Sequence, residues 1–269
     1  MSNLAVNKLE MNDEYLQRVA PSIFALGAQS GRSKHYKFIP TIEIINALRQ
    51  EGFYPVKAAQ SNSKNAEKRK HSKHMVRFRK DIGQTYAVGD LIPEIELINS
   101  HDGTSQYLLN SGIYRLACSN GLVVSVNDID SIKVRHSGNI VDNVIEGSYR
   151  IIQETPKVFD RIERMREVAL NNAEKQIFAR AAASLRWDKD IYEVDPNVMI
   201  KPIREADRQD DLWTSLNILQ EKLLSGQTLI HNIETDKLRK ARPVTNVDET
   251  SRLNKAIWQL VEEMLKLKQ

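Results

Sequence analysis

Apolar and polar positions alternate in short runs through the first part of the chain. Each run is bounded by Gly, Asn, Asp or Pro, residues that permit turns, and this pattern is typical of β-strands. Asn120-Gly121, between two apolar runs, favours a hairpin because both residues tolerate positive φ. Short strands in series, with few long helices between them, favour an antiparallel sheet. The runs that we interpret as strands are residues 53–60, 74–80, 91–99, 107–118, 122–126 and 132–136.

Two amphipathic segments in the same region predict helices that cover one face of this sheet. Residues 41–50 begin with Thr41, a capable N-cap, and stop at Gly52. A second helix is expected near residues 141–153. Residues 61–72 are polar and charged enough for a loop or a hairpin tip. The predicted fold class is α+β, an antiparallel sheet with a basic hairpin covered by helices and followed by a helical C-terminal half.

The apolar period becomes helical beyond residue 155. Thr155-Pro156 predicts a helix start, because an N-cap is followed by proline at the first helical position. An apolar stripe continues from there toward Trp187. Two more helices are expected at about residues 207–225 and 248–268, with residues 227–246 as a mobile basic loop between them. The predicted parts are an N-terminal arm at 1–30, an α+β core at 31–155 and a helical region at 156–269.

Composition restricts the class of protein. Apolar residues make up 41% and charged residues 28% of the chain, which is ordinary globular usage. No apolar run approaches the roughly 20 residues needed to cross a bilayer, and the first turns of the chain lack the apolar stretch of a signal peptide. Cys118, the single cysteine, cannot form an internal disulfide, which suits a reducing compartment. We expect a cytoplasmic protein without a membrane partner.

The distribution of charge is more informative than the net charge of +4. Residues 64–80 hold eight basic residues against one acid, Glu67, so this segment carries +7 and the rest of the chain sums to −3. A cluster of this density attracts phosphate backbones and releases their counterions. A solvated basic loop is the alternative interpretation.

Arg77 and Arg79 alternate along the predicted strand 74–80, so they point to one face and can follow successive phosphates. Phe78, between them, is expected to face the core. Basic residues on neighbouring strands would widen the positive surface, or serve solubility alone. The predicted nucleic-acid-binding residues are Lys68, Arg69, Lys70, Lys73, Arg77, Arg79, Lys80, Arg115, Lys133 and Arg135.

Signals for catalysis are weak. The sequence has neither a Gly-x-x-x-x-Gly-Lys-Ser/Thr nor a Gly-x-Gly-x-x-Gly motif, so no nucleotide cofactor is expected. Ser100, His101 and Asp102 are consecutive, and consecutive residues rarely meet the geometry of a triad, so a structured turn is the better interpretation. His71 and His74 stand among cations that would repel a metal ion. We assign no catalytic residue, metal ligand or cofactor.

Several strings of residues together resemble a DUF932-type domain, a phage- and plasmid-like domain of unknown function found on mobile elements and prophages. They are YKFIPT at 36–41, EGFYPV at 51–56, HMVRFR at 74–79, PEIELINSHDG at 93–103 and RLACSNGL at 115–122. DLWT at 211–214 and RLNKAIW at 252–258 are similar to the helical tail of its plasmid members. The resemblance covers about residues 34–268 and implies a place on mobile DNA.

The expected fold suggests a second, more remote resemblance. A sheet with a basic hairpin beside helices is similar to the single-strand annealing proteins related to Rad52 and phage recombinases, which form rings and need no nucleotide. This resemblance brings no catalytic residues with it.

Three hypotheses follow. The first is a DNA-binding protein of a mobile element, a single-strand annealing or recombination factor that acts without ATP and forms a homo-oligomer through its helical half. The second is an anti-defence or regulatory protein that binds a host protein, with Trp213 and Trp258 as anchors. The third is a metal-dependent nuclease in which His101 is the general base and Asp102 orients it.

Overall fold

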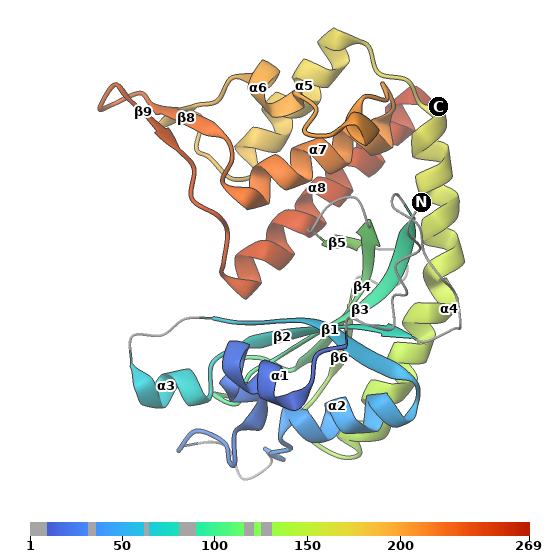
Figure 1. Cartoon of the computed structure of the whole chain (residues 1–269), viewed down its shortest axis with the longest axis vertical. Coiled ribbons are helices and arrows are strands. Elements are labelled where there is room, and N and C mark those ends of the chain that lie inside the picture. Colours follow the sequence, from blue (N-terminus) through green and yellow to red (C-terminus); the bar gives the residue numbers. More distant parts are fainter. Residues whose placement is uncertain (1–9, 32–35, 62–64, 81–89, 116–120, 125–130) are drawn as a thin grey trace. The chain divides into compact units, whose positions relative to one another are not determined.

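The computed structural model describes residues 10–31, 36–61, 65–80, 90–115, 121–124 and 131–269. The chain divides into two compact units, residues 1–155 and 156–269 (Figure 1). In the described part of the chain, none of the helices combines the length and the apolar character that crossing a bilayer requires.

An antiparallel sheet forms the basis of the first unit, which confirms the predicted fold class. The strand order is β1-β2-β3-β4-β5, and β6 pairs with the beginning of β4 while β5 pairs with its end. Cys118 lies outside the described residues. Asn120, and therefore the predicted Asn120-Gly121 turn, lies outside them as well. The strands are β1 (Phe53–Gln60), β2 (His74–Lys80), β3 (Leu91–Asn99), β4 (Tyr107–Arg115), β5 (Gly121–Val124) and β6 (Ile132–Val134).

Helices cover one face of this sheet and bury its apolar side chains. Val76 and Phe78 of β2 are fully buried there, so Phe78 faces the core as predicted. Burying each such side chain contributes on the order of 2 kcal/mol. The covering elements are α1 (Asp13–Val19), the 3₁₀ turn η2 (Pro21–Phe24), α2 (Thr41–Gln50) and the first half of α4 (Ile140–Glu167).

A short helix, α3 (Ala66–Lys70), lies in the segment that the sequence predicted as a loop. It stands at the end of the β1–β2 hairpin (Figure 1). Asn65 caps it by accepting hydrogen bonds from the backbone amides of Glu67 and Lys68. The residues that follow are good helix formers, so a capped turn forms even within a polar segment.

The predicted helix start at Thr155-Pro156 is wrong, because α4 is continuous from Ile140 to Glu167 with Pro156 inside it. The buried stripe runs through this point, with Ile151 before it and Val158 after it. The Thr155 hydroxyl donates to the carbonyl of Ile151, 3.3 Å away. Burial of the stripe on both sides outweighs the backbone hydrogen bond that proline removes.

The second unit is mainly helical, as predicted. Its helix α7 ends at Gly226, where φ is +72°, as the sequence indicated. Residues 227–246, predicted as a mobile loop, form instead a hairpin of β8 and β9 that projects from the helices of its unit (Figure 1). The elements are α5 (Asn172–Ser184), β7 (Tyr192–Glu193), α6 (Pro196–Ile200), η3 (Glu205–Asp207), α7 (Leu212–Ser225), β8 (Leu229–Asn232), β9 (Lys237–Lys240) and α8 (Val247–Lys268).

The two tryptophans predicted as anchors for a partner are core residues. Trp213 on α7 and Trp258 on α8 are 3% and 1% exposed. An anchor for a partner must present its ring to solvent before binding, so neither side chain can serve in this state.

Candidate nucleic-acid interface

Helix α3 carries the exposed part of the basic cluster. Lys68, Arg69 and Lys70 occupy its last turn, where cations are favoured by the helix dipole, and all three are exposed. Lys70 forms an ion pair with Glu67 at 2.9 Å, and this hydrogen bond lowers the pKa of the Glu67 carboxyl. Both partners are largely exposed, so the pair is weak and Lys70 can exchange it for a phosphate.

Buried and half-buried polar groups hold α3 to the hairpin. Gln60 of β1 donates from Nε2 to the carbonyl of Arg69 at 2.8 Å and accepts at Oε1 from the amide of Ser22 at 2.9 Å. The Ser72 hydroxyl donates to the carbonyl of Lys68 at 2.9 Å. The carbonyls at the end of the helix are thus satisfied by neighbouring elements. The cations therefore stand on a fixed backbone rather than on a free loop.

Arg77 and Arg79 share a face of the sheet, as their alternation predicted, but they are not exposed. They are 2% and 3% exposed and lie on the face opposite to the helices. Arg77 stands directly across from Glu96 on β3 and pairs with it at 3.0 Å. Arg79 pairs with Glu94 at 2.8 Å, and Arg77 reaches the same carboxylate at 3.3 Å. The predicted row of phosphate contacts along β2 is corrected to a buried, charge-balanced network.

Further polar groups complete this network. Asn110 of β4 donates to Glu96 at 3.1 Å and accepts from the Ser131 hydroxyl at 2.7 Å. The guanidinium of Arg79 lies 4.5 Å from the centre of the Tyr114 ring. Burial alone would lower the pKa of Arg77, but Glu96 and Glu94 outweigh it and raise that pKa. Two cations and two anions pair within this network, which links β2 to β3 and presents no net charge.

The remaining predicted residues are divided among other places. Lys73 is half-buried, and Lys80 lies over the rings of Tyr149 and Phe53, 3.9 and 4.7 Å from their centres. Arg115 is buried. Lys133 and Arg135 on and after β6 are exposed and, with Arg150, line a pocket of about 430 Å³ between that strand and α4.

A buried histidine cluster beside the hairpin is the feature that sequence reasoning missed. His74 and His101 are 1% and 0% exposed, with ring centres 5.3 Å apart, and Thr41 lies between them. The Thr41 oxygen is 2.8 Å from Nε2 of His74 and 3.2 Å from Nε2 of His101, so Thr41 does not cap its helix as predicted. His74 and Thr41 are 33 positions apart in the sequence, and the fold brings their side chains into hydrogen-bond contact.

Both ring nitrogens of His74 have hydrogen-bond partners. Nδ1 of His74 is 2.8 Å from the Ser22 hydroxyl and 3.1 Å from the Ser72 carbonyl, and Nε2 is 2.8 Å from the Thr41 hydroxyl. Asn99 donates from Nδ2 to the Thr41 hydroxyl oxygen at 3.1 Å.

Burial accordingly lowers the pKa of both histidines, which are neutral at pH 7. It lowers the pKa of His74 to about 4. Burial, together with its neighbour His74, lowers the pKa of His101 to about 3.

The pairing required for the nuclease hypothesis is not formed. His101 bonds to Thr41, whereas the carboxylate of Asp102 accepts from Ser100 and Thr104 in the turn that the sequence predicted. Among the residues that the structure describes, no three His, Cys, Asp or Glu side chains gather as metal ligands.

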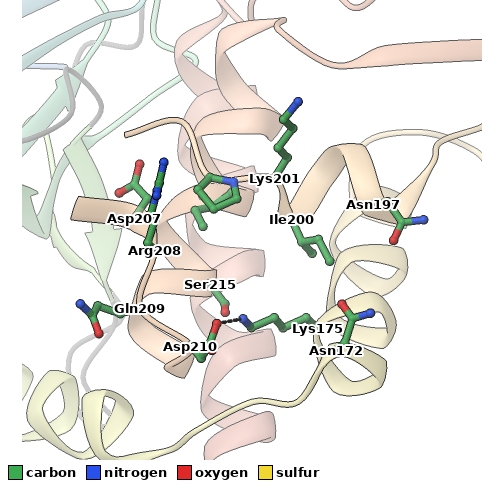
Figure 2. A pocket seen from close by; sticks show the side chains of 12 residues that line it. Asn172, Lys175, Asn197, Ile200, Lys201, Asp207, Arg208, Gln209, Asp210 and Ser215 are labelled. Atoms are coloured by element: carbon green, nitrogen blue, oxygen red, sulfur yellow. Dashed lines mark hydrogen bonds and ion pairs between the residues drawn. The ribbon is translucent and has the colours of Figure 1, made fainter. Parts of the chain in front are cut away.

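A pocket of about 300 Å³ in the second unit has a mixed lining (Figure 2). Lys175 reaches from α5 to the carboxylate of Asp210, and this hydrogen bond lowers the pKa of Asp210. Lys201 and Arg208 contribute two exposed cations to the rim. The lining does not pair a nucleophile with a base, so it supports no assignment of chemistry.

Comparisons with known proteins agree on one family. The model of a domain of unknown function, DUF932, matches residues 28–258. Two proteins of Escherichia coli (strain K12), UPF0380 protein YfjQ and UPF0380 protein YafZ, are each 35% identical over 264 residues, which is 98% of this chain and 95% of each relative. No solved structure matches, and the expected similarity to Rad52-type annealing proteins finds no support in these comparisons. The chain belongs to the DUF932 family.

Proposed function

We propose that this protein binds DNA through α3, at the end of the β1–β2 hairpin. The observation that carries the proposal is the set of three exposed cations on one tethered helix, Lys68, Arg69 and Lys70, against a single exposed acid, Glu67. Cations on a fixed backbone neutralise phosphates at low entropic cost and release the counterions of the strand. Single-strand annealing without nucleotide hydrolysis, by several copies of the chain, is the form of DNA handling that we propose.

The ion network of Arg77 and Arg79 has a supporting role in this proposal. Their charges are balanced by Glu94 and Glu96, so they add little to the field that a phosphate meets. They hold β2 against β3 and thereby keep the hairpin that carries α3 in register.

Fluorescence anisotropy of a labelled oligonucleotide against salt concentration tests the proposal. The triple variant Lys68→Ala/Arg69→Ala/Lys70→Ala should reduce the slope of log affinity against log salt by about 2, because each neutralised phosphate contributes about 0.7 on a single strand. The matched control is Arg166→Ala/Arg208→Ala/Lys266→Ala, which removes three exposed cations of the second unit. Each of these pairs with an acid three positions before it, as Lys70 does. Absence of salt-sensitive binding by the unaltered protein, or an unchanged slope in the α3 variant, would overturn the proposal.

A second candidate function, binding of a host protein, has support from the β8–β9 hairpin. The register pairs Leu229 with Lys240 and His231 with Leu238, so both leucines and Lys240 share one face. Leu229 is 46% and Leu238 66% exposed. Exposed leucines beside a cation suit a protein surface that is apolar with an acidic rim.

Co-purification from a nuclease-treated bacterial lysate tests this candidate. A stoichiometric protein should accompany the unaltered chain and be lost from Leu229→Ser/Leu238→Ser. Leu267→Ser is the matched control, because Leu267 is 85% exposed and lies at the end of α8 rather than on the hairpin. Equal recovery with both variants would remove the hairpin as a docking surface.

A further inference from the structure

An apolar pocket lies beside the cations of α3. It encloses about 520 Å³, a volume typical of small-ligand sites, between the segment that follows η2 and the end of α3. Its apolar wall includes Phe24 and Leu26, and its other side is formed by Arg69, Lys70 and His71. One hollow thus combines an apolar wall with a cationic rim.

The apolar wall is held in place although part of it faces solvent. Leu26 is 99% exposed, while Phe24 packs partly against the core. The backbone on either side is fixed, because the amide of Ala25 donates to the carbonyl of Ser22 and the amide of Gln29 to that of His101. Contact between an exposed apolar side chain and water is unfavourable. A ligand that covers the side chain removes this contact and binds more tightly for that reason.

The cationic rim is fixed by the same neighbourhood. The amide of His71 donates to the carbonyl of Lys68 at 3.2 Å, and the amide of His101 donates to the carbonyl of His71 at 3.1 Å. These hydrogen bonds connect the backbone at the end of α3 to the backbone of the segment that carries Phe24 and Leu26. A ligand that fills the pocket must bring a flat or apolar group and a negative charge close together.

A nucleotide of a single strand has this chemistry. Its base offers an apolar face for stacking and its phosphate meets the cations. In a duplex the bases are stacked on one another and paired, so that face is hidden. We infer that the pocket beside α3 receives an unstacked base of single-stranded nucleic acid while Arg69 and Lys70 hold the adjoining phosphate. The inference rests on the proposed function and adds a preference for single strands to it.

Three labelled probes, each titrated at several salt concentrations, test the inference. They are a single-stranded oligonucleotide, its duplex, and a strand of the same length in which abasic sites replace the bases. Stacking contributes about 1 to 3 kcal/mol per base, so the single strand should bind the protein roughly 5- to 150-fold more tightly than the abasic strand. Leu26→Ser should reduce this ratio and leave the salt slope unchanged, because it removes no cation. Leu26→Trp should increase it, and Leu267→Ser should leave both quantities unaltered.

The outcomes separate this inference from the proposed function. If the three probes bind with equal affinity and the α3 triple variant binds each of them more weakly, DNA binding through α3 stands and the base pocket is wrong. If no probe binds, the proposed function fails. If the Leu26 variants bind all probes as the unaltered protein does, the pocket does not receive a base and the inference is overturned.

Discussion

At the scale of single residues, two buried histidines beside the β1–β2 hairpin make the stability of the protein depend on pH. His74 and His101 are neutral in the fold because burial disfavours the charged form of each ring. In the unfolded chain both would take up a proton near pH 6.5. Between pH 6.5 and the lower pKa values of the folded state, the unfolded state therefore binds more protons than the folded state. The free energy of unfolding falls as the pH falls through this range.

We expect the free energy of unfolding to decrease from pH 6.5 toward pH 4, with His74 alone accounting for about 3 kcal/mol of the loss at pH 4. Urea unfolding at several pH values measures this loss. The variant His74→Gln/His101→Gln should have a lower stability at pH 7 and a flatter dependence. His231→Gln is the control, because the pKa of His231 is raised by its hydrogen bond to Asp236, so its titration acts in the opposite direction. A pH dependence as steep in the double variant as in the unaltered protein would contradict the assignment.

A second prediction at this scale concerns the buried ion network. Arg77→Ala leaves Glu96 buried without its cation, while Glu94 keeps its pair with Arg79, so the substitution should destabilise the protein by about 3 to 5 kcal/mol. Lys68→Ala, on the exposed helix, should change stability by less than about 0.5 kcal/mol. Chemical denaturation measures both values. Equal effects of the two substitutions would show that Arg77 is not part of a buried network.

At the scale of elements, the sequence predicted most strands and the helices of residues 41–50 and 248–268, because their apolar positions repeat with a clear period. It predicted correctly that Arg77 and Arg79 share a face. The alternation of residues along β2 does not show which groups contact that face. Glu94 and Glu96 on the neighbouring strand β3 pair with the arginines there. The antiparallel register between these two strands places Arg77 and Glu96, which have opposite charges, across from each other.

The elements that the sequence missed have local causes that period analysis does not detect. Helix α3 depends on one cap, Asn65, in a segment with no apolar stripe. The β8–β9 hairpin has a turn in which Asp236 takes φ +51°, and its exposed strands lack a clear buried face. The histidine cluster joins residues far apart in sequence, so no local pattern could reveal it.

Gly226 gives a prediction for the connection between α7 and this hairpin. Its φ is +72°, and an added Cβ would lie 2.5 Å from the nitrogen of Pro243 and 2.6 Å from the oxygen of Ala241. Gly226→Ala should lower stability by clearly more than the roughly 1 kcal/mol of an unfavourable φ alone. Gly52→Ala is the matched control, because Gly52 has φ +79° and open space around its Cβ position. Thermal unfolding compares them, and equal losses would mean that the backbone near residue 241 gives way.

At the scale of the whole molecule, annealing requires that several chains act on one strand. We expect the particle mass to rise in discrete steps when single-stranded DNA is added, and complementary strands to anneal faster without ATP. The α3 triple variant should lose most of this acceleration, since phosphate contacts bring the strands to the protein. Mass photometry and a fluorescence-quenching annealing assay measure the two quantities. A single monomer mass with and without DNA would exclude annealing by an assembly of this chain.

The carboxamide of Gln60 has a consequence for how binding would be observed. Its oxygen and its nitrogen are committed to two different elements, the amide of Ser22 and the carbonyl of Arg69. A ligand that steadies α3 would therefore slow the exchange of the Ser22 amide hydrogen with solvent, although Ser22 itself touches no phosphate. Gln60→Leu would cut this link. The Ser22 amide is thus a built-in reporter, readable by hydrogen exchange, of events at the tip of the hairpin.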